Sequence, residues 1–206
     1  MRRGTGGVVV AVGCAALLLT GLVASARTPA IHTSQEDPND ANGALDVRLV
    51  ELHHSTPTTP VWTFVTFSTW TVDRMWDKGY LLVYLDTYWG DRPDYYALIR
   101  SDGDRLRGEL FRDKVDGPDV FLQDLTVWRG DAHRAAVKVP LSAMRIGTVR
   151  SVYRWYTVTL LTSAICPSVC LDRVPDEGMV EQLLPGATTT PPTTSPPTET
   201  TATPTG

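Results

Sequence analysis

Three aspartates in one short polar segment are the residues best suited to bind a metal ion. Asp86, Asp91 and Asp94 follow an apolar stretch, and a turn between them would bring their carboxylate oxygens around one point. Oxygen ligands of this kind are preferred by a hard cation such as Ca²⁺. Tyr88 and Trp89 lie in the middle of the segment, where a dense calcium-binding run would carry Asp and Gly. The alternative is a plain hairpin turn in which the aspartates cap backbone amides.

Tryptophans offer a second kind of site, because exposed indole faces stack against the apolar faces of sugar rings. The chain has six tryptophans. Trp89 lies in an expected turn and Trp76 lies between two expected strands, so these two side chains are candidates for a solvent-facing glycan platform. The others fall within expected strands, where a tryptophan is more often part of the core. These four are Trp62, Trp70, Trp128 and Trp155.

Catalysis and nucleic-acid binding find little support in the sequence. It has no Gly-x-Ser-x-Gly elbow, no His-Glu-x-x-His pair and no phosphate-binding glycine-rich loop. The net charge of −4 at pH 7 argues against the basic surface that nucleic acids require. A carboxylate pair such as Asp73 with Glu109 would suit glycoside hydrolysis if the fold brought the two together. A glycoside hydrolase therefore stays an alternative to a binding protein.

The two ends of the chain are typical of an exported protein. Arg2 and Arg3 precede an uncharged apolar segment that closes with small residues, which predicts a cleaved signal peptide over residues 1–26. An uncleaved membrane anchor is the alternative, because the apolar run approaches the length that spans a bilayer. We expect a flexible polar leader over 27–42 and a disordered Thr/Pro-rich tail over 185–206, either bare or glycosylated. The protein is thus expected outside the cell or in the cell envelope.

Two cysteines remain once the signal segment, with Cys14, is removed. Cys166 and Cys170 would face an oxidising compartment and are expected to form a disulfide. The ring is short, so the bond should pin a local loop and contribute about 2 kcal/mol. A metal site is the alternative, but the segment between the cysteines supplies no His or further Cys.

Residues 43–184 are expected to form one all-β domain. Short runs rich in β-branched and aromatic residues alternate with turn residues such as Gly103. Apolar and polar residues alternate over 135–139, which indicates a sheet with one wet face, whereas the apolar run 81–85 suits the centre of a sheet. The pattern predicts a two-sheet antiparallel sandwich of the jelly-roll kind. The expected strands are 45–52, 61–70, 80–87, 94–101, 105–112, 121–129, 132–139 and 151–162, with a helical turn at 140–144 and a terminal helix at 176–184.

Two segments carry a resemblance to known domains. In 84–95 a hydrophobic strand ends in Leu-Asp before an acidic turn, and in 137–142 an apolar strand is followed by Pro-Leu and a small polar residue. Both resemble β-sandwiches related to family 9 carbohydrate-binding modules and to DOMON domains. The run 45–179 also resembles uncharacterised secreted proteins of actinobacterial type. The resemblance implies a β-sandwich that tends to bind sugars or haem, and it implies no particular reaction.

The residues and the resemblance together predict an exported, non-catalytic binding module for a polysaccharide or another glycan at the cell envelope. Calcium is the one cofactor that the residues suggest. Membrane contact would come only through the signal segment, if that segment is kept. A structural or partner-binding surface protein is the main alternative, and it would present a flat apolar patch.

Overall fold

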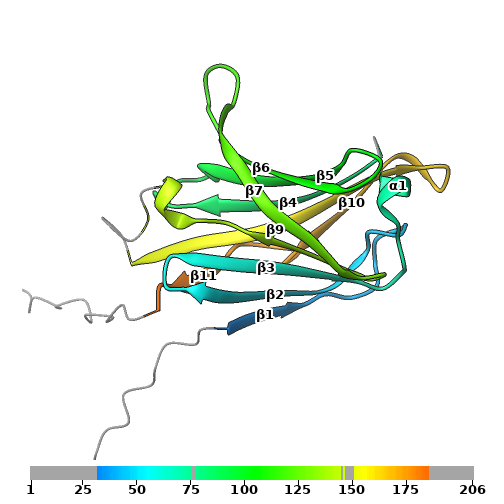
Figure 1. The fold of residues 1–206 in the computed structure, drawn as a ribbon, viewed down its shortest axis with the longest axis horizontal. Coiled ribbons are helices and arrows are strands. Elements are labelled where there is room, and N and C mark those ends of the chain that lie inside the picture. Colours follow the sequence, from blue (N-terminus) through cyan, green and yellow to red (C-terminus); the bar gives the residue numbers. More distant parts are fainter. Residues whose placement is uncertain (1–31, 76–77, 145, 147–150, 186–206) are drawn as a thin grey trace, which may run out of the picture.

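The computed structural model describes residues 32–75, 78–144, 146 and 151–185, which form an antiparallel β fold (Figure 1). Eleven strands among them join into one continuous sheet, in the order β1-β2-β3-β8-β7-β6-β5-β4-β9-β10, with β11 also paired to β9. The all-β prediction is confirmed. The elements are β1 (His32–Glu36), β2 (Val47–Thr56), β3 (Thr59–Thr66), α1 (Val72–Met75), β4 (Gly79–Asp86), β5 (Tyr95–Ser101), β6 (Leu106–Arg112), β7 (Val120–Asp131), β8 (Arg134–Lys138), η1 (Leu141–Met144), β9 (Val152–Ser163), β10 (Cys166–Val174) and β11 (Val180–Leu183).

Strand β7 belongs to both layers of the fold. Its first half pairs with β6 and its second half, from Thr126 onward, pairs with β8. The sheet therefore turns over along β7 into layer A (β1, β2, β3, β8) and layer B (β6, β5, β4, β9, β10, β11), as Figure 1 shows. Gly108 of β6 permits the close approach of β7, because a Cβ at this position would lie 2.3 Å from a methyl group of Val127. The predicted two-layer sandwich is thus joined through one long strand.

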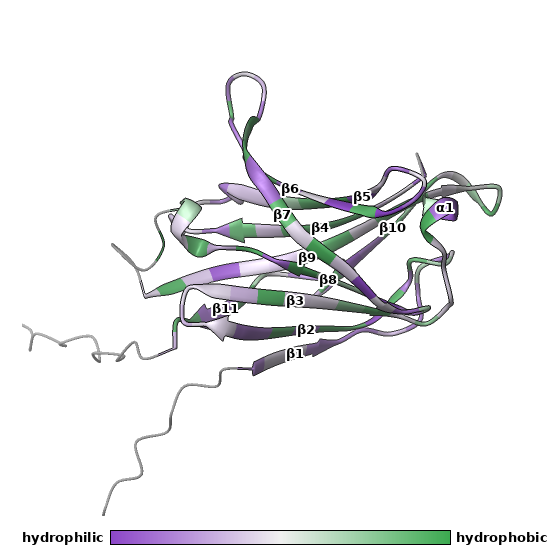
Figure 2. Ribbon diagram, in the orientation of Figure 1, coloured by the Kyte–Doolittle hydropathy of each residue, from purple (hydrophilic) through white to green (hydrophobic). Residues whose placement is uncertain are grey.

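The core lies between the two layers and is built by the inward-facing residues of each strand. Apolar and polar positions alternate along several strands in Figure 2, as a sheet with one buried face requires. Trp62 of β3 and Trp155 of β9 meet edge to face across the layers, with ring centroids 6.2 Å apart. Trp70 is also buried, so three of the four tryptophans expected in the core lie there. Trp128 is the exception, since it lies on the outer face of layer A with 42 % of its surface exposed.

Expectations for the two ends of the domain are partly wrong. The segment 32–36, expected within a flexible leader, forms β1 and pairs with β2. The segment 176–184, expected to hold a helix, contains β11, which pairs with the first residues of β9. Strand β10 was not expected either, and it pairs with the rest of the same edge of β9. Edge strands of this kind are held by backbone hydrogen bonds to a longer neighbour, so their own side chains need show no apolar alternation.

The predicted disulfide between Cys166 and Cys170 is confirmed. It spans a bulge in β10, where the pairing with β9 shifts register between the two cysteines, and their Cα atoms lie 5.3 Å apart. The helical turn expected at 140–144 is also present, as η1. So is the hairpin at Gly103, which has a φ of 101°.

The two free edges of the sheet approach each other along a line that we call the seam. On one side are β1 and β2, and on the other are β10 and β11 (Figure 1). The backbone N–H of Val47 in β2 donates to Asp172 Oδ2 in β10 at 2.6 Å. The hydroxyl of Thr33 in β1 donates to Gln182 Oε1 in β11 at 2.7 Å. Side chains rather than a backbone ladder therefore close the seam.

Two predictions fall outside the described residues. The signal peptide predicted over 1–26 lies within the undescribed residues 1–31, and nearly all of the tail predicted over 185–206 lies within 186–206. Among the described residues, no helix has the length and apolar character needed to span a bilayer.

Candidate functional site

The outer face of layer B carries a line of aromatic side chains that crosses the strands. The residues on either side of each tyrosine in the sequence are buried, so strand alternation turns the three tyrosine rings outward, and the two phenylalanines follow on the same face by their pairing with β5 and β6. The cross-strand register then places them next to one another. We call this line the aromatic row, and its members are Tyr156 (β9), Tyr84 (β4), Tyr96 (β5), Phe111 (β6) and Phe121 (β7).

Neighbouring rings of the aromatic row are in direct contact. Tyr84 stacks on Tyr156 with centroids 4.8 Å apart, and it meets Tyr96 at 5.8 Å with a tilt of 43°. Tyr96 stacks on Phe111 at 5.1 Å, and Phe111 meets Phe121 edge to face at 5.8 Å. The row spans four interstrand spacings, or roughly 19 Å. Its length and narrowness suit an extended ligand that lies across the strands.

Stacking determines which parts of the rings a ligand can reach. The inner rings are half-buried and cover one another's faces, so they offer mainly edges and phenolic hydroxyls. Phe121, at one end of the row, is 50 % exposed and offers a ring face. At the other end, the guanidinium of Arg173 lies 4.3 Å from the centroid of the Tyr156 ring and covers that ring.

The tyrosine hydroxyls of the row are held in the neutral form, in which a phenol can donate a hydrogen bond. Burial is the main cause that raises the pKa of Tyr84, Tyr96 and Tyr156, and nearby aspartates add to the effect. The Tyr96 hydroxyl donates to Asp119 Oδ2 at 2.8 Å, and this bond lowers the pKa of the Asp119 carboxyl. Asp119 belongs to the loop between β6 and β7, which projects from the body of the fold in Figure 1.

An apolar strip lies beside the aromatic row, with charged pairs near both. Leu82, Leu98 and Val158 share one cross-strand register on the same outer face. Next to Leu98, Arg100 donates to Glu109 through two nitrogens, at 2.9 and 3.1 Å. Leu82 and Val158 are only 6 % and 8 % exposed, so the strip offers a ligand little apolar surface and mainly supports the row beside it.

The acidic turn between β4 and β5 lies at the end of the strand that supplies Tyr84. Asp86 is fully buried, and its Oδ1 accepts the backbone N–H groups of Tyr88 at 3.2 Å and Trp89 at 2.7 Å. Its Oδ2 is paired with the guanidinium of Arg154. Asp94 Oδ2 accepts backbone N–H groups from Thr87 at 2.7 Å and Tyr88 at 3.0 Å. Both aspartates therefore hold the turn by capping amides.

The predicted calcium ligands Asp86, Asp91 and Asp94 are not gathered around one point. Among the described residues, the carboxylates that do converge are Asp37 and two neighbours at the seam. The exposed Asp91 takes no part in the capping bonds of Asp86 and Asp94. The geometry fits the capped hairpin turn, and calcium binding at these three residues stays a prediction.

Of the two predicted platform tryptophans, Trp89 is 45 % exposed, and Trp76 lies outside the described residues. Trp89 has a φ of 61°, a left-handed conformation that is unusual for a bulky residue. The capping bond from its N–H to Asp86 holds it there, and the guanidinium of Arg154 lies 5.1 Å from its ring centroid. Arg154 is two residues from Tyr156 on the same face of β9, so Trp89 lies beside the end of the aromatic row.

Asp73 and Glu109, the carboxylates considered for glycoside hydrolysis, do not lie in environments that would raise the pKa of either one. Asp73 is exposed at α1, and its pKa is lowered chiefly by a hydrogen bond from Thr71. The pKa of Glu109 is lowered by its hydrogen bond to Arg100. A glycosidase needs one carboxyl with a raised pKa to act as the acid. Neither residue has that property.

A cleft lies where β7 leaves β6. It has a volume of about 590 Å³ and is lined by polar and apolar residues of β6 and β7, Trp128 among them, together with Val72 and the turn before β6. No member of the aromatic row is among the residues that line this cleft. Trp128 in this cleft therefore serves as a control position for experiments on ligand binding at the aromatic row.

Comparison with known protein families, with characterised proteins and with solved structures found no match to this chain. The aromatic row was not expected from the sequence, which pointed to tryptophans only. The available signal was the outward position of each aromatic residue within its strand, as at Tyr84 and Tyr96. Their contact depends on strand register, which a single sequence does not reveal.

Proposed function

We propose that this protein is an exported, non-catalytic binding module that holds a polysaccharide or another glycan along the aromatic row. The observation that carries the proposal is the contiguous line of rings from Tyr156 to Phe121, extended at one end by Trp89. A sugar chain could rest its apolar faces on the exposed rings and hydrogen-bond to the tyrosine hydroxyls. The resemblance to carbohydrate-binding modules points to the same ligand class.

Export is part of the proposal and rests on two supports. The signal-like segment 1–26 predicts translocation, and the Cys166–Cys170 disulfide is typical of an oxidising compartment. Under this proposal the Thr/Pro-rich tail acts as an extended spacer, because its composition offers little apolar surface to bury.

The test is retention of the purified protein on insoluble polysaccharides and on a glycan array. Trp89→Gly and Phe121→Ala remove exposed ring faces. Glycine also accepts the left-handed backbone at position 89, so this variant should stay folded. Each variant should bind about 3- to 10-fold more weakly, as expected for the loss of one aromatic contact.

Trp128→Ala is the matched control, since Trp128 is as exposed as Trp89 (42 % against 45 %) but lies on layer A. It should retain glycan like the wild type. Wild-type retention by both Trp89→Gly and Phe121→Ala would refute the proposed site. A loss of glycan retention seen only in Trp128→Ala would show that the glycan binds in the cleft between β6 and β7 and not at the aromatic row.

Binding of a protein partner is a second candidate function, favoured by exposed aliphatic side chains on the β9–β10 hairpin. Ile165, Val169 and Leu171 are exposed by 66 %, 49 % and 58 %. Exposed apolar clusters of this kind often mark contact surfaces. Leu171→Ser separates the two functions, because it should leave glycan retention unchanged if the aromatic row is the binding site.

A further inference from the structure

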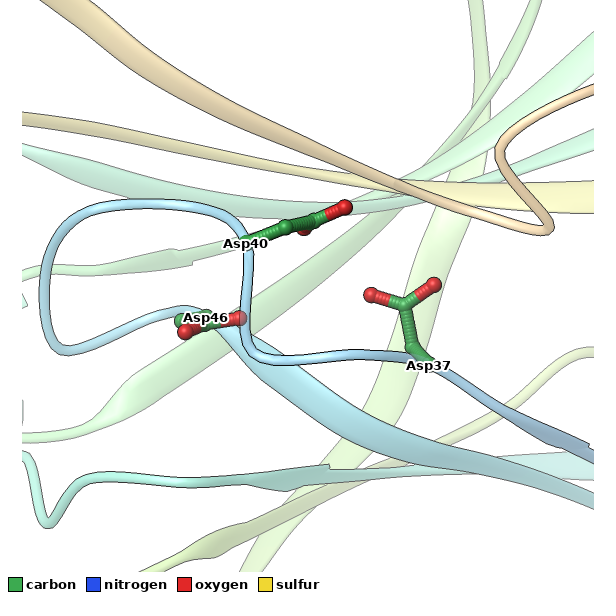
Figure 3. Close-up of side chains that lie close together, drawn as sticks. All are labelled: Asp37, Asp40 and Asp46. Atoms are coloured by element: carbon green, nitrogen blue, oxygen red, sulfur yellow. The ribbon is translucent and has the colours of Figure 1, made fainter.

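Three carboxyl groups converge at the seam, away from the aromatic row. Asp37 follows β1, Asp40 lies in the loop between β1 and β2, and Asp46 directly precedes β2. One oxygen from each lies within 4.8 Å of the others. Figure 3 shows the three side chains turned toward the same space.

Burial sets this cluster apart from an ordinary acidic loop. Asp37 and Asp46 are only 8 % and 4 % exposed, whereas Asp40 lies at the surface. Asp37 Oδ2 and Asp46 Oδ1 are buried and accept no hydrogen bond from the described part of the chain. Buried carboxylate oxygens are seldom left without a partner, because losing water costs several kcal/mol unless another group replaces it. These oxygens therefore point to a ligand.

Within the described part of the chain, the surroundings of the cluster add negative charge and supply no cation in an ion pair with it. Asp172 of β10, which is 5 % exposed, accepts the N–H of Val47, and its negative charge contributes to raising the pKa of Asp37. The negative charge of Asp176 also raises the pKa of Asp37. None of the ion pairs among the described residues involves these carboxylates. A bound cation would supply the missing positive charge.

The donor set selects the type of cation. All the groups are carboxylate oxygens, without the His or Cys ligands that zinc and copper prefer. The donors come from an irregular loop and a strand end, which suits the variable geometry of Ca²⁺ better than the strict octahedron of Mg²⁺. We propose that Asp37, Asp40 and Asp46 bind a calcium ion at the seam, with Asp172 as a positioning residue behind Asp37.

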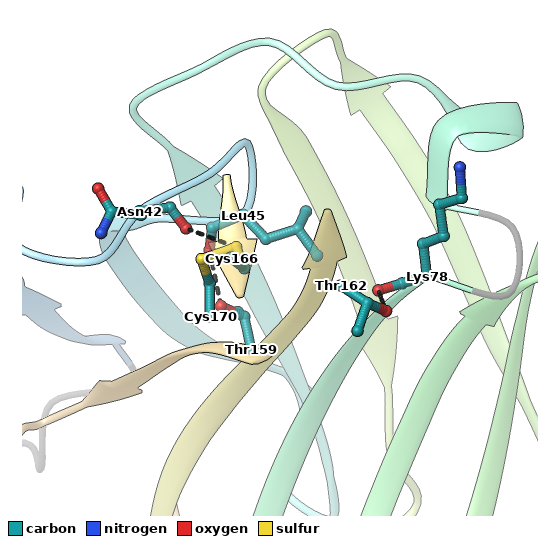
Figure 4. The surroundings of a disulfide bond; sticks show 7 residues. All are labelled: Asn42, Leu45, Lys78, Thr159, Thr162, Cys166 and Cys170. Atoms are coloured by element: carbon teal, nitrogen blue, oxygen red, sulfur yellow. Dashed lines mark hydrogen bonds between the residues drawn. A yellow bond between two sulfur atoms is a disulfide. The ribbon is translucent and has the colours of Figure 1, made fainter. Parts of the chain in front are cut away.

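The position of the loop explains what the ion would do. On its other side the loop packs against β9 and the disulfide: the carbonyl of Asn42 lies 3.9 Å from Cys166 Sγ, and the hydroxyl of Thr159 donates to the carbonyl of Leu45 at 2.6 Å (Figure 4). A Cβ at Gly43 would come within 2.7 Å of Leu161. Calcium would hold the open side of this loop and so fix the connection between β1 and β2 at the seam.

The experiment uses the full purified chain, stripped with EDTA and titrated with CaCl₂ up to about 10 mM, a range that covers the weak sites of extracellular modules. Calorimetry and thermal melting provide two readouts. The wild type should release or take up heat and melt several degrees higher with calcium. Asp40→Asn and Asp46→Asn should each bind calcium at least tenfold more weakly, and Asp91→Asn is the matched control that should bind like the wild type.

Folding of the variants is checked in EDTA. There Asp46→Asn should melt at or above the wild-type temperature, because a neutral amide replaces a buried carboxylate oxygen that has no partner. The proposal is overturned if the wild type shows neither heat nor a melting shift. Wild-type calcium affinity in both Asp40→Asn and Asp46→Asn would also overturn it, as would a loss confined to Asp91→Asn, which would place the ion at the β4–β5 turn.

Discussion

The ion pair between Arg154 and Asp86 should be the most important charge interaction of the candidate site. Asp86 is fully buried, while the side chain of Arg154 is 26 % exposed. Arg154 also donates to the carbonyl of Gly90 at 3.0 Å and covers the ring of Trp89. Changing Arg154 to Met keeps much of the packing but leaves a buried carboxylate without its cation.

The expected loss of stability in Arg154→Met depends on the hydrogen bonds that Asp86 still accepts in this variant. Breaking a fully buried ion pair by removing one partner costs about 3–5 kcal/mol. Here the carboxylate still accepts two backbone N–H groups, from Tyr88 and Trp89, and water can enter from the exposed side of Arg154. We therefore expect Arg154→Met to lower the free energy of unfolding by about 2–3 kcal/mol, or the melting temperature by roughly 5–10 °C.

Urea unfolding and thermal melting measure this effect. Arg92→Met is the matched control, because the pair of Arg92 with Asp113 (2.7 Å) is at the surface and should contribute less than about 1 kcal/mol. The double variant Asp86→Asn/Arg154→Met should lose at least about 1 kcal/mol less than the two single losses added together, since the contacts are shared. Equal small losses in Arg154→Met and Arg92→Met would show that the reasoning about Asp86 is wrong.

Three further predictions concern the scaffold. Gly108→Ala should cost about 2 kcal/mol in urea unfolding, because its Cβ would lie 2.3 Å from a valine methyl and 3.0 Å from Leu125 Cβ; a loss below 0.5 kcal/mol would contradict the close β6–β7 approach. Replacing both Cys166 and Cys170 by Ser should cost about 2 kcal/mol while far-UV circular dichroism stays that of a β protein; loss of the folded spectrum would contradict a local role. In EDTA, the melting temperature should fall as pH rises from about 4 to 8, because burial and neighbouring carboxylates raise the pKa of Asp37 from 3.8 to about 7. A group with a raised folded-state pKa stabilises the fold below its unfolded pKa and loses that contribution as pH rises through the folded value, so a flat or rising profile would contradict the prediction. The charged groups that act on Asp37 are Asp172, Asp176 and Asp40.

Local features of the fold could be predicted because they depend on neighbours in the sequence. Apolar alternation and turn residues located the hairpin at Gly103 and the central strand that contains Leu81 to Leu85. The spacing of Cys166 and Cys170 predicted their disulfide. At the candidate site, the sequence predicted that Trp89 is exposed. It also offered amide capping by Asp86 as the alternative to calcium binding.

Tertiary structure alone decided which distant residues meet. The rings of Tyr84 and Tyr156 touch because β4 and β9 pair in one register, and a shift by one residue would turn either ring into the core. The segment with Asp37 appeared to be a flexible leader, since polar side chains give no sign of an edge strand held by its backbone. The sequence by itself thus determined strands, turns and the disulfide, which arise from local sterics and solvation. The aromatic row and the carboxylate cluster were decided by pairing between strands, which brings together residues whose sequence contexts are independent.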